Sequence, residues 1–191
     1  MSLPFSSTTA DAMDWDEAMD LIRHLYRDGN YTWSLLIAAG CVTGLRISDI
    51  LKLRYCDLLS PEFGIIEQKT GKHRTIRVNG HLAAHALKCY RALGIQDASR
   101  RAFISRKNTV FSIQRVNVVF KELKRRYGLK VKNFSSHSLR KTFGRRVVEM
   151  SGTNSEPDDM RYFVEAGLDQ IESDYPLVLR EVLGELEEKA K

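Results

Sequence analysis

Apolar residues recur at the spacing of an amphipathic helix along most of this chain, and that period changes at only one place. Helical spacing puts every third or fourth side chain on one face, so each such segment predicts a helix that buries that face. Thr32 and Ser136 stand where N-caps are expected. The predicted helices cover residues 14–27, 32–44, 46–53, 80–93, 112–127, 136–148, 159–165 and 177–188.

The change of period begins at Gly64. Residues 65–69 and 73–78 are rich in β-formers and flank a Thr-Gly pair, which predicts a β-hairpin. Residues 102–104 read as a short third strand. The sequence therefore predicts a mainly α fold with a small antiparallel β-sheet at one edge, in the α+β class.

Composition and length favour one domain behind a short leader. Residues 1–11 are rich in Ser, Thr and Pro and are expected to be a flexible leader, with the domain in residues 12–191. No apolar run approaches the roughly 20 residues that span a bilayer. Cys41, Cys56 and Cys89 are odd in number and widely spaced. A disulfide framework or structural zinc site is therefore not expected, and we expect a cytoplasmic protein.

Charge is distributed unevenly along the chain. The formal net charge is +6, but residues 31–150 carry 24 basic and 7 acidic side chains, a net charge of +17. Residues 1–30 have a net charge of −4 and residues 151–191 of −7. A strongly cationic middle segment is typical of proteins that bind a polyanion such as a nucleic acid.

Two short segments each place an arginine beside groups that handle protons. One is Thr-Gly-Leu-Arg-Ile-Ser-Asp at 43–49, and the other is His-Ser-Leu-Arg at 137–140. A guanidinium offers a rigid fork of donors that matches two phosphate oxygens and keeps its charge. Arg46 and Arg140 are 94 positions apart, so only folding can bring both to one phosphate.

Three blocks occur in the order and spacing of a known family. They are residues 43–53, the Lys-Thr-Gly-Lys segment at 69–72, and His-Ser-Leu-Arg-Lys-Thr-Phe at 137–143. Together they resemble the catalytic domain of the tyrosine recombinases, or phage integrase family, over roughly residues 12–185. The resemblance implies that residues 12–191 form such a catalytic domain, without the DNA-binding domains that commonly precede it. It also implies a site-specific recombinase or integrase that cuts and rejoins DNA through a 3′-phosphotyrosine.

The resemblance assigns roles to the residues of these blocks. Arg46 and Arg140 match the two catalytic arginines, which would stabilise the charge that builds on the scissile phosphate. Asp49 lies one helical turn after Arg46, where a carboxylate can orient its guanidinium. His137 would assist proton transfer or bond the phosphate near a helix N-terminus. Lys69 matches the lysine that protonates the leaving 5′ oxygen, and Lys72 is a less favoured alternative.

The nucleophile of the family is a tyrosine some thirty positions after the second arginine. Tyr162 lies 22 positions after Arg140 and Tyr175 lies 35 after it, so we expect Tyr175 to be the nucleophile. Because the phosphodiester energy is kept in the covalent link, the resemblance implies catalysis without metal or other cofactor.

The resemblance and the charge distribution also predict binding partners. Double-stranded DNA is the expected partner, contacted also by the basic residues Lys72, Arg74, Lys141 and Arg145. A C-terminal apolar stripe predicts a helix that packs on its own chain or on another copy. It consists of Leu179, Val182, Leu183 and Leu186.

One departure from the family pattern keeps alternatives open. The family usually has a histidine or tryptophan shortly before the tyrosine, but no histidine or tryptophan follows His137 here. Glu165 or Ala166 stands at the equivalent place, and a carboxylate would repel the phosphate. The alternative is a DNA-binding or regulatory relative with a degenerate active site, and a third is an inert helical protein that assembles through its tail.

Overall fold

A computed structural model describes residues 10–69, 71–105 and 107–151 of the chain. The chain divides into two compact units, residues 1–143 and residues 144–191. Of the candidate site residues, Arg46, Asp49, Lys69, His137 and Arg140 belong to the first unit. Most of the leader expected at 1–11, the helices expected at 159–165 and 177–188, and Tyr175 lie outside the described residues.

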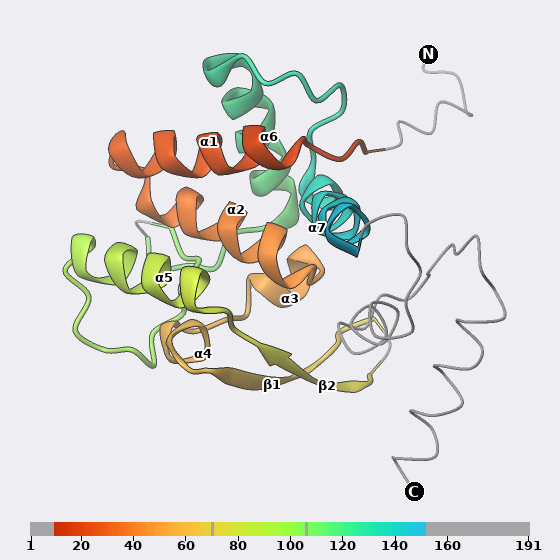
Figure 1. The fold of residues 1–191 in the computed structure, drawn as a ribbon. Helices are drawn as coiled ribbons and strands as arrows, with labels where there is room; N and C mark the ends of the chain where they lie inside the picture. Colours follow the sequence, from red (N-terminus) through yellow and green to blue (C-terminus); the bar gives the residue numbers. More distant parts are fainter. Residues whose placement is uncertain (1–9, 70, 106, 152–191) are drawn as a thin grey trace, which may run out of the picture. The chain divides into compact units, whose positions relative to one another are not determined.

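The described part is mainly helical, with one two-stranded antiparallel sheet (Figure 1). The predicted fold class is therefore confirmed. In chain order the elements are α1 (Trp15–Arg27), α2 (Tyr31–Thr43), α3 (Ile47–Ile50), α4 (Tyr55–Leu59), β1 (Glu62–Ile66), β2 (His73–Arg77), α5 (Gly80–Ala92), α6 (Ile113–Tyr127) and α7 (Ser136–Ser151).

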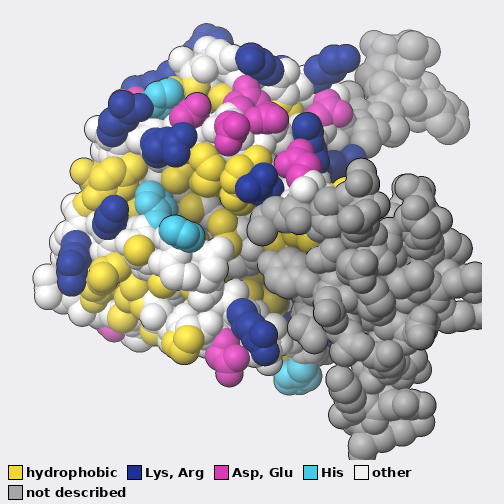
Figure 2. Space-filling model, in the orientation of Figure 1, with side chains coloured by type: hydrophobic (Ala, Val, Ile, Leu, Met, Phe, Trp, Pro, Cys, Tyr) yellow, Lys and Arg dark blue, Asp and Glu magenta, His cyan; other side chains and the backbone are white. Residues whose placement is uncertain are grey.

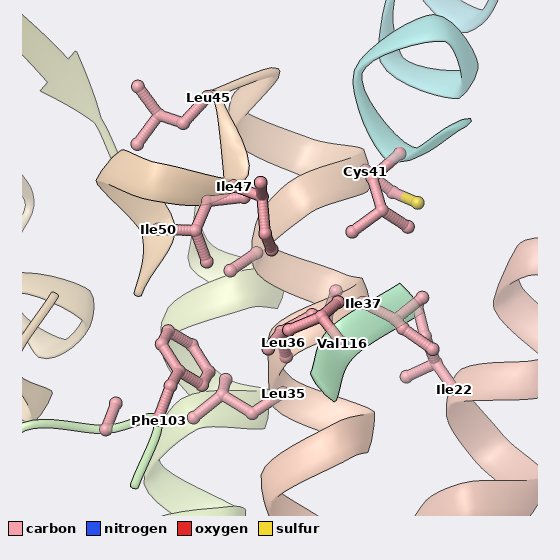
Figure 3. Close-up of a cluster of buried hydrophobic side chains, with 14 of the residues drawn as sticks. Ile22, Leu35, Leu36, Ile37, Cys41, Leu45, Ile47, Ile50, Phe103 and Val116 are labelled. Carbon is pink, nitrogen blue, oxygen red and sulfur yellow. The ribbon is translucent and has the colours of Figure 1, made fainter. Parts of the chain in front are cut away.

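Helix α2 is the centre of the core. It is apolar on nearly every side, as expected of a helix surrounded by protein, and it lies between α1 and α5 (Figure 1). Side chains from α1, α2, α3 and α6 meet around it, with Phe103 from the segment before α6 (Figure 3). The helix starts after Asn30, so the prediction that Thr32 is its N-cap was wrong.

The hairpin forms in the predicted place with different limits. Strands β1 and β2 pair from Glu62 opposite Arg77 to Ile66 opposite His73. Glu67, Gln68 and Lys69 leave the ladder and enter the turn. The prediction of a third strand at 102–104 was wrong. The pairs at either end of this segment, Arg54 with Arg101 and Ile104 with Val110, are isolated bridges and form no ladder.

Short helices were harder to predict. The helix expected at 46–53 is a single turn, α3, which Arg46 precedes in extended conformation. Helix α4 was not anticipated, because five residues are too few for a period to be read. Ser136 is the first residue of α7 rather than its N-cap, and its backbone N–H donates to Asn117 Oδ1 at 2.9 Å.

Gly40 of α2 and Gly44, which caps the end of this helix, allow α7 to approach closely. A Cβ at Gly40 would lie 2.5 Å from Leu139 Cδ1, and a Cβ at Gly44 would lie 2.3 Å from Phe143 Cδ1. Gly40 and Gly44 are one helical turn apart and face Leu139 and Phe143, which are likewise four residues apart. The missing side chains therefore let the first turns of α7 pack against the end of α2.

Among the described residues, no helix is long and apolar enough to cross a membrane.

Candidate active site

Arg140 reaches the segment that carries Arg46. Its Nη1 donates to the carbonyl oxygen of Gly44 at 3.1 Å. Gly44 ends α2 with φ of +61°, and Arg46 follows two residues later at the start of α3. The close packing of α7 on Gly40 and Gly44 thus brings Arg140 to the backbone two residues before Arg46.

The side chain of Arg46 is held by a carboxylate from the hairpin. Arg46 Nη1 donates to Glu67 Oε2 at 2.8 Å, and the Arg46 side chain is 18% exposed. Partial exposure leaves the guanidinium within reach of a ligand, while the ion pair restricts its orientation.

Glu67 is a residue of this site that sequence reasoning missed. Its side chain is 2% exposed, and its other carboxylate oxygen accepts a bond of 2.6 Å from Arg74 Nη1. One buried carboxylate therefore bridges two guanidinium groups. In the sequence, Glu67 is an acidic residue after two isoleucines at the end of a strand. This pattern alone does not reveal that the side chain is buried or which residue it pairs with.

Asp49 contacts the hairpin turn. Its Oδ1 accepts from the backbone N–H of Gln68 at 3.1 Å and lies 3.9 Å from Lys52 Nζ. The side chain is 3% exposed, and Oδ2 has no hydrogen-bond partner. Within the described part of the chain, the carboxylate that bonds the Arg46 guanidinium is that of Glu67, whereas Asp49 supports the turn that carries Lys69.

The turn presents both candidate lysines to solvent. The backbone N–H of Glu67 donates to the Lys72 carbonyl oxygen at 3.0 Å, and Gly71 N–H donates to the Glu67 carbonyl oxygen at 2.9 Å. Gly71 has φ of +68°, which glycine adopts without strain. Lys69 and Lys72 are both exposed on this turn, so the choice between them stays a prediction.

His137 and Lys141 are exposed near the start of α7, on either side of the half-buried Arg140. Arg145 belongs to the second unit, where its Nε bonds Glu149 Oε1 at 2.8 Å. The structure thus brings Arg140 to the Arg46 segment and attaches the Lys69 turn to α3. The prediction that Tyr175 is the nucleophile, and the place of Glu165, lie outside the described residues.

Surface charge is mixed on the face shown in Figure 2. Lys and Arg side chains there are interspersed with acidic and apolar ones rather than gathered in one patch.

In the described part of the chain, no group of three or more His, Cys, Asp or Glu residues could hold a metal ion.

Comparison with known proteins identifies the family and the fold. The model of the phage integrase family matches residues 12–155. The crystal structure of XerA recombinase superposes with a TM-score of 0.64 at 18% identity, covering 100% of this chain and 67% of that one. The catalytic core of lambda integrase superposes with a TM-score of 0.58 at 16% identity, covering 86% of this chain and 95% of that one.

A third similar structure is the Tn1549 transposon integrase in complex with transposon right end DNA. Its TM-score is 0.56 at 17% identity, over 99% of this chain and 69% of that one. No curated protein matches the sequence. At these identities the structural likeness shows the fold, whereas the family match covers most of the chain and includes both arginines, Lys69 and His137. The chain belongs to the phage integrase family.

Proposed function

We propose that this chain is the catalytic domain of a site-specific DNA recombinase or integrase, which breaks and rejoins double-stranded DNA. The observation that carries the proposal is the bond from Arg140 Nη1 to the Gly44 carbonyl oxygen, two residues before Arg46. It brings Arg140, from a distant part of the sequence, to the segment that carries Arg46. Family membership and the DNA in the Tn1549 integrase structures support the substrate.

The two arginines would bind the non-bridging oxygens of the scissile phosphate. Negative charge accumulates on these oxygens in the pentacoordinate transition state, where fixed donors are most effective. Arg46 is restrained by Glu67 and Arg140 by the Gly44 carbonyl, so neither guanidinium requires a large rearrangement to receive the phosphate. The contribution of each is therefore electrostatic preorganisation.

Proton transfers accompany bond cleavage. The phenolic oxygen of Tyr175 would attack phosphorus as its proton leaves, assisted by His137, and the bond to the 5′ oxygen would break. Lys69 on the exposed turn would supply the proton that the leaving 5′ oxygen takes up. The products are a 3′-phosphotyrosine and a free 5′-hydroxyl, and attack by another 5′-hydroxyl reverses these steps and reseals the strand.

The same proposal covers the cofactors, the DNA contacts, the assembly and the location of the protein. The phosphodiester energy stays in the phosphotyrosine, so the proposed chemistry uses no metal or other cofactor. Lys72, Arg74, Lys141 and Arg145 would contact the DNA backbone, and the C-terminal stripe would join copies of the chain on DNA. We infer a cytoplasmic location because the substrate is DNA and all three cysteines are free thiols.

Covalent trapping tests the proposal. A suicide duplex, nicked so that the cleaved end diffuses away, is prepared from the DNA that flanks the gene and is incubated with the protein. We expect a covalent protein–DNA adduct on a denaturing gel that the Tyr175→Phe variant does not form. The Tyr162→Phe variant is the matched control, because it removes the other candidate phenol and is expected to leave the adduct intact.

Two outcomes would overturn the proposal. Salt-sensitive DNA binding without an adduct would identify a DNA-binding relative that has lost turnover. Failure to bind DNA even at low salt would remove DNA as the partner altogether.

A further inference from the structure

We propose that Glu67 is a positioning residue, which holds Arg46 and the Lys69 turn in one fixed arrangement. The inference rests on the proposed function, since it assigns Glu67 a part in orienting the groups that would contact the phosphate and the leaving oxygen. Glu67 itself does not touch DNA in this proposal and acts through its neighbours.

The side chain of Glu67 uses both carboxylate oxygens. Oε2 accepts from Arg46 Nη1 at 2.8 Å, and Oε1 accepts from Arg74 Nη1 at 2.6 Å. The exposed fractions are 2% for Glu67, 18% for Arg46 and 13% for Arg74. The pairs are therefore largely shielded from water, and charge-assisted bonds of this kind restrict the rotation of a guanidinium.

The main chain of Glu67 closes the turn that carries Lys69. Its N–H donates to the Lys72 carbonyl oxygen at 3.0 Å, and its carbonyl oxygen accepts from Gly71 N–H at 2.9 Å. Lys69 lies inside the segment that these two bonds close. One residue thus fixes the first arginine through its side chain and the base of the lysine turn through its backbone.

A second acidic residue strengthens the same connection from the other side. Asp49 Oδ1 accepts from Gln68 N–H, the residue next to Glu67, at 3.1 Å. Two bonds consequently join α3 and its N-cap to the turn. Arg46, the N-cap, bonds Glu67, and Asp49 of α3 bonds Gln68. Because two bonds at different points resist rotation as well as separation, the turn is oriented relative to Arg46.

Electrostatics gives Glu67 a further role. Arg46 and Arg74 carry like charges, and the buried carboxylate between them offsets their repulsion. Loss of its charge would remove this offset and weaken the two bonds that restrict the guanidinium groups. A group misplaced by about 1 Å can lower a rate by roughly 10²-fold, so the effect on the reaction would exceed the effect on binding.

The main test compares adduct formation with DNA binding in Glu67→Gln, which keeps the side-chain shape but loses the charge. We expect the rate of adduct formation to fall by roughly 10- to 100-fold. Affinity for the same duplex should stay equal or rise, because the site has gained one positive charge. Glu62→Gln is the matched control, since Glu62 is an exposed acid of the same hairpin, and it should change neither rate nor affinity by more than about twofold.

A double-mutant cycle asks whether Glu67 acts through Arg46. In an Arg46→Lys background, which cannot form the same forked pair, Glu67→Gln should lower the adduct rate by much less than it does in the wild-type chain. Independent, multiplicative losses would overturn the positioning role. Parallel losses of rate, affinity and melting temperature in Glu67→Gln would also overturn it, because they would show a purely structural ion pair.

A measurement that needs no activity separates this inference from the proposed function. In ¹⁵N-labelled protein, the guanidinium signals of Arg46 and Arg74 should show slow rotation that Glu67→Gln abolishes and Glu62→Gln preserves. Unchanged signals would overturn the inference even if the wild type forms adducts. If the wild type forms none but the signals respond as expected, the positioning stands and the recombinase proposal fails.

Should Glu67→Gln not fold, as judged by circular dichroism, Glu67→Asp replaces it. Aspartate keeps the charge but is one methylene shorter, so it cannot reach both guanidinium groups at the observed distances. We expect one of the two arginine signals to lose its slow rotation in this variant. Retention of slow rotation by both arginines would overturn the inference.

Discussion

Two requirements at position 44 can be met together only by glycine. Its φ of +61° lies in the left-handed region, and its missing side chain leaves the space that the Phe143 ring occupies. Its carbonyl oxygen also accepts the bond from Arg140. One glycine thus ends α2, admits α7 and sets the position of the second arginine.

Gly44→Ala is therefore expected to destabilise the protein. The added Cβ would lie 2.3 Å from Phe143 Cδ1 in a strained backbone conformation. Together these effects should lower the free energy of unfolding by roughly 2–5 kcal/mol, measured by urea denaturation. Gly80→Ala is the control, because a Cβ there meets nothing within 4 Å, and it should be neutral or slightly stabilising. Equal stability of both variants would contradict the packing argument.

His85 is a second residue with a measurable consequence. Its Nε2 lies 2.9 Å from Ser34 Oγ and 3.6 Å from Cys89 Sγ. Ser34 Oγ donates to the Ile22 carbonyl oxygen, so the neutral ring joins α1, α2 and α5. Burial lowers the pKa of His85, and the charge of Lys88 lowers this pKa further.

This lowered pKa predicts how stability depends on pH. The folded protein protonates His85 at a lower pH than the unfolded chain, which takes up this proton near the ordinary pKa of 6.5. The free energy of unfolding should therefore decrease as the pH falls below about 6.5, and His85 should contribute no slope above it. Denaturation of His85→Gln between pH 5 and 8 should show a smaller decrease, whereas His81→Gln, an exposed histidine of the same helix, should match the wild type.

At the scale of elements, α7 depends on contacts at its start. Thr142 Oγ1 donates to the Ser138 carbonyl oxygen at 2.8 Å and accepts from the backbone N–H of Met13 at 2.9 Å. Thr142 and Met13 are both about 1% exposed. This hydroxyl thus attaches the segment before α1 to the helix that carries His137 and Arg140.

Thr142→Val tests this attachment. Valine has nearly the same shape but leaves the buried Met13 N–H without its acceptor, which should lower the free energy of unfolding by about 1–3 kcal/mol. Thr75→Val on the exposed side of β2 changes the same atoms without a buried partner and should stay within about 0.5 kcal/mol of wild type. Chemical denaturation of both variants measures the difference. If Thr142→Val lost no more stability than Thr75→Val, water would be able to replace Thr142 as the acceptor for the Met13 N–H.

For the whole molecule, the charge distribution predicts how the proposed DNA binding would depend on salt. Residues 31–150 carry a net charge of +17 and contain every described residue of the candidate site. The flanking segments carry −4 and −7. A cationic central segment should release counterions from DNA and make affinity strongly dependent on salt.

Lys141→Ala is expected to weaken DNA binding uniformly across sequences. Lys141 is exposed directly after Arg140, where it can reach a backbone phosphate. The slope of log affinity against log salt concentration, measured by fluorescence anisotropy, should become shallower by about one. Lys88→Ala, which removes the same charge from the exposed side of α5, should leave the slope nearly unchanged. Equal changes in both variants would indicate an effect of net charge alone.

Much of the fold could be predicted because its helices have clear periods. The buried residues of α1 (Ala18, Leu21, Ile22 and Leu25) follow the helical spacing of that segment, and α6 forms within the predicted range 112–127, with Ser112 as its N-cap. Predictions were wrong where the local signal was short or ambiguous. Thr32 and Asn30 both favour a helix start, and three apolar residues at 102–104 fit a strand as well as a buried loop.

Local pattern and residue chemistry were enough to determine the helical class, the hairpin and the family, because period, turn residues and short motifs are properties of neighbouring positions. Tertiary structure alone decided that Arg140 bonds the Gly44 carbonyl, that Glu67 rather than Asp49 pairs with Arg46, and that Asp49 supports the turn. These contacts join residues 19 to 96 positions apart, and one of them involves a different acidic residue from the one expected. Such choices depend on burial and distance, which only the packed chain sets.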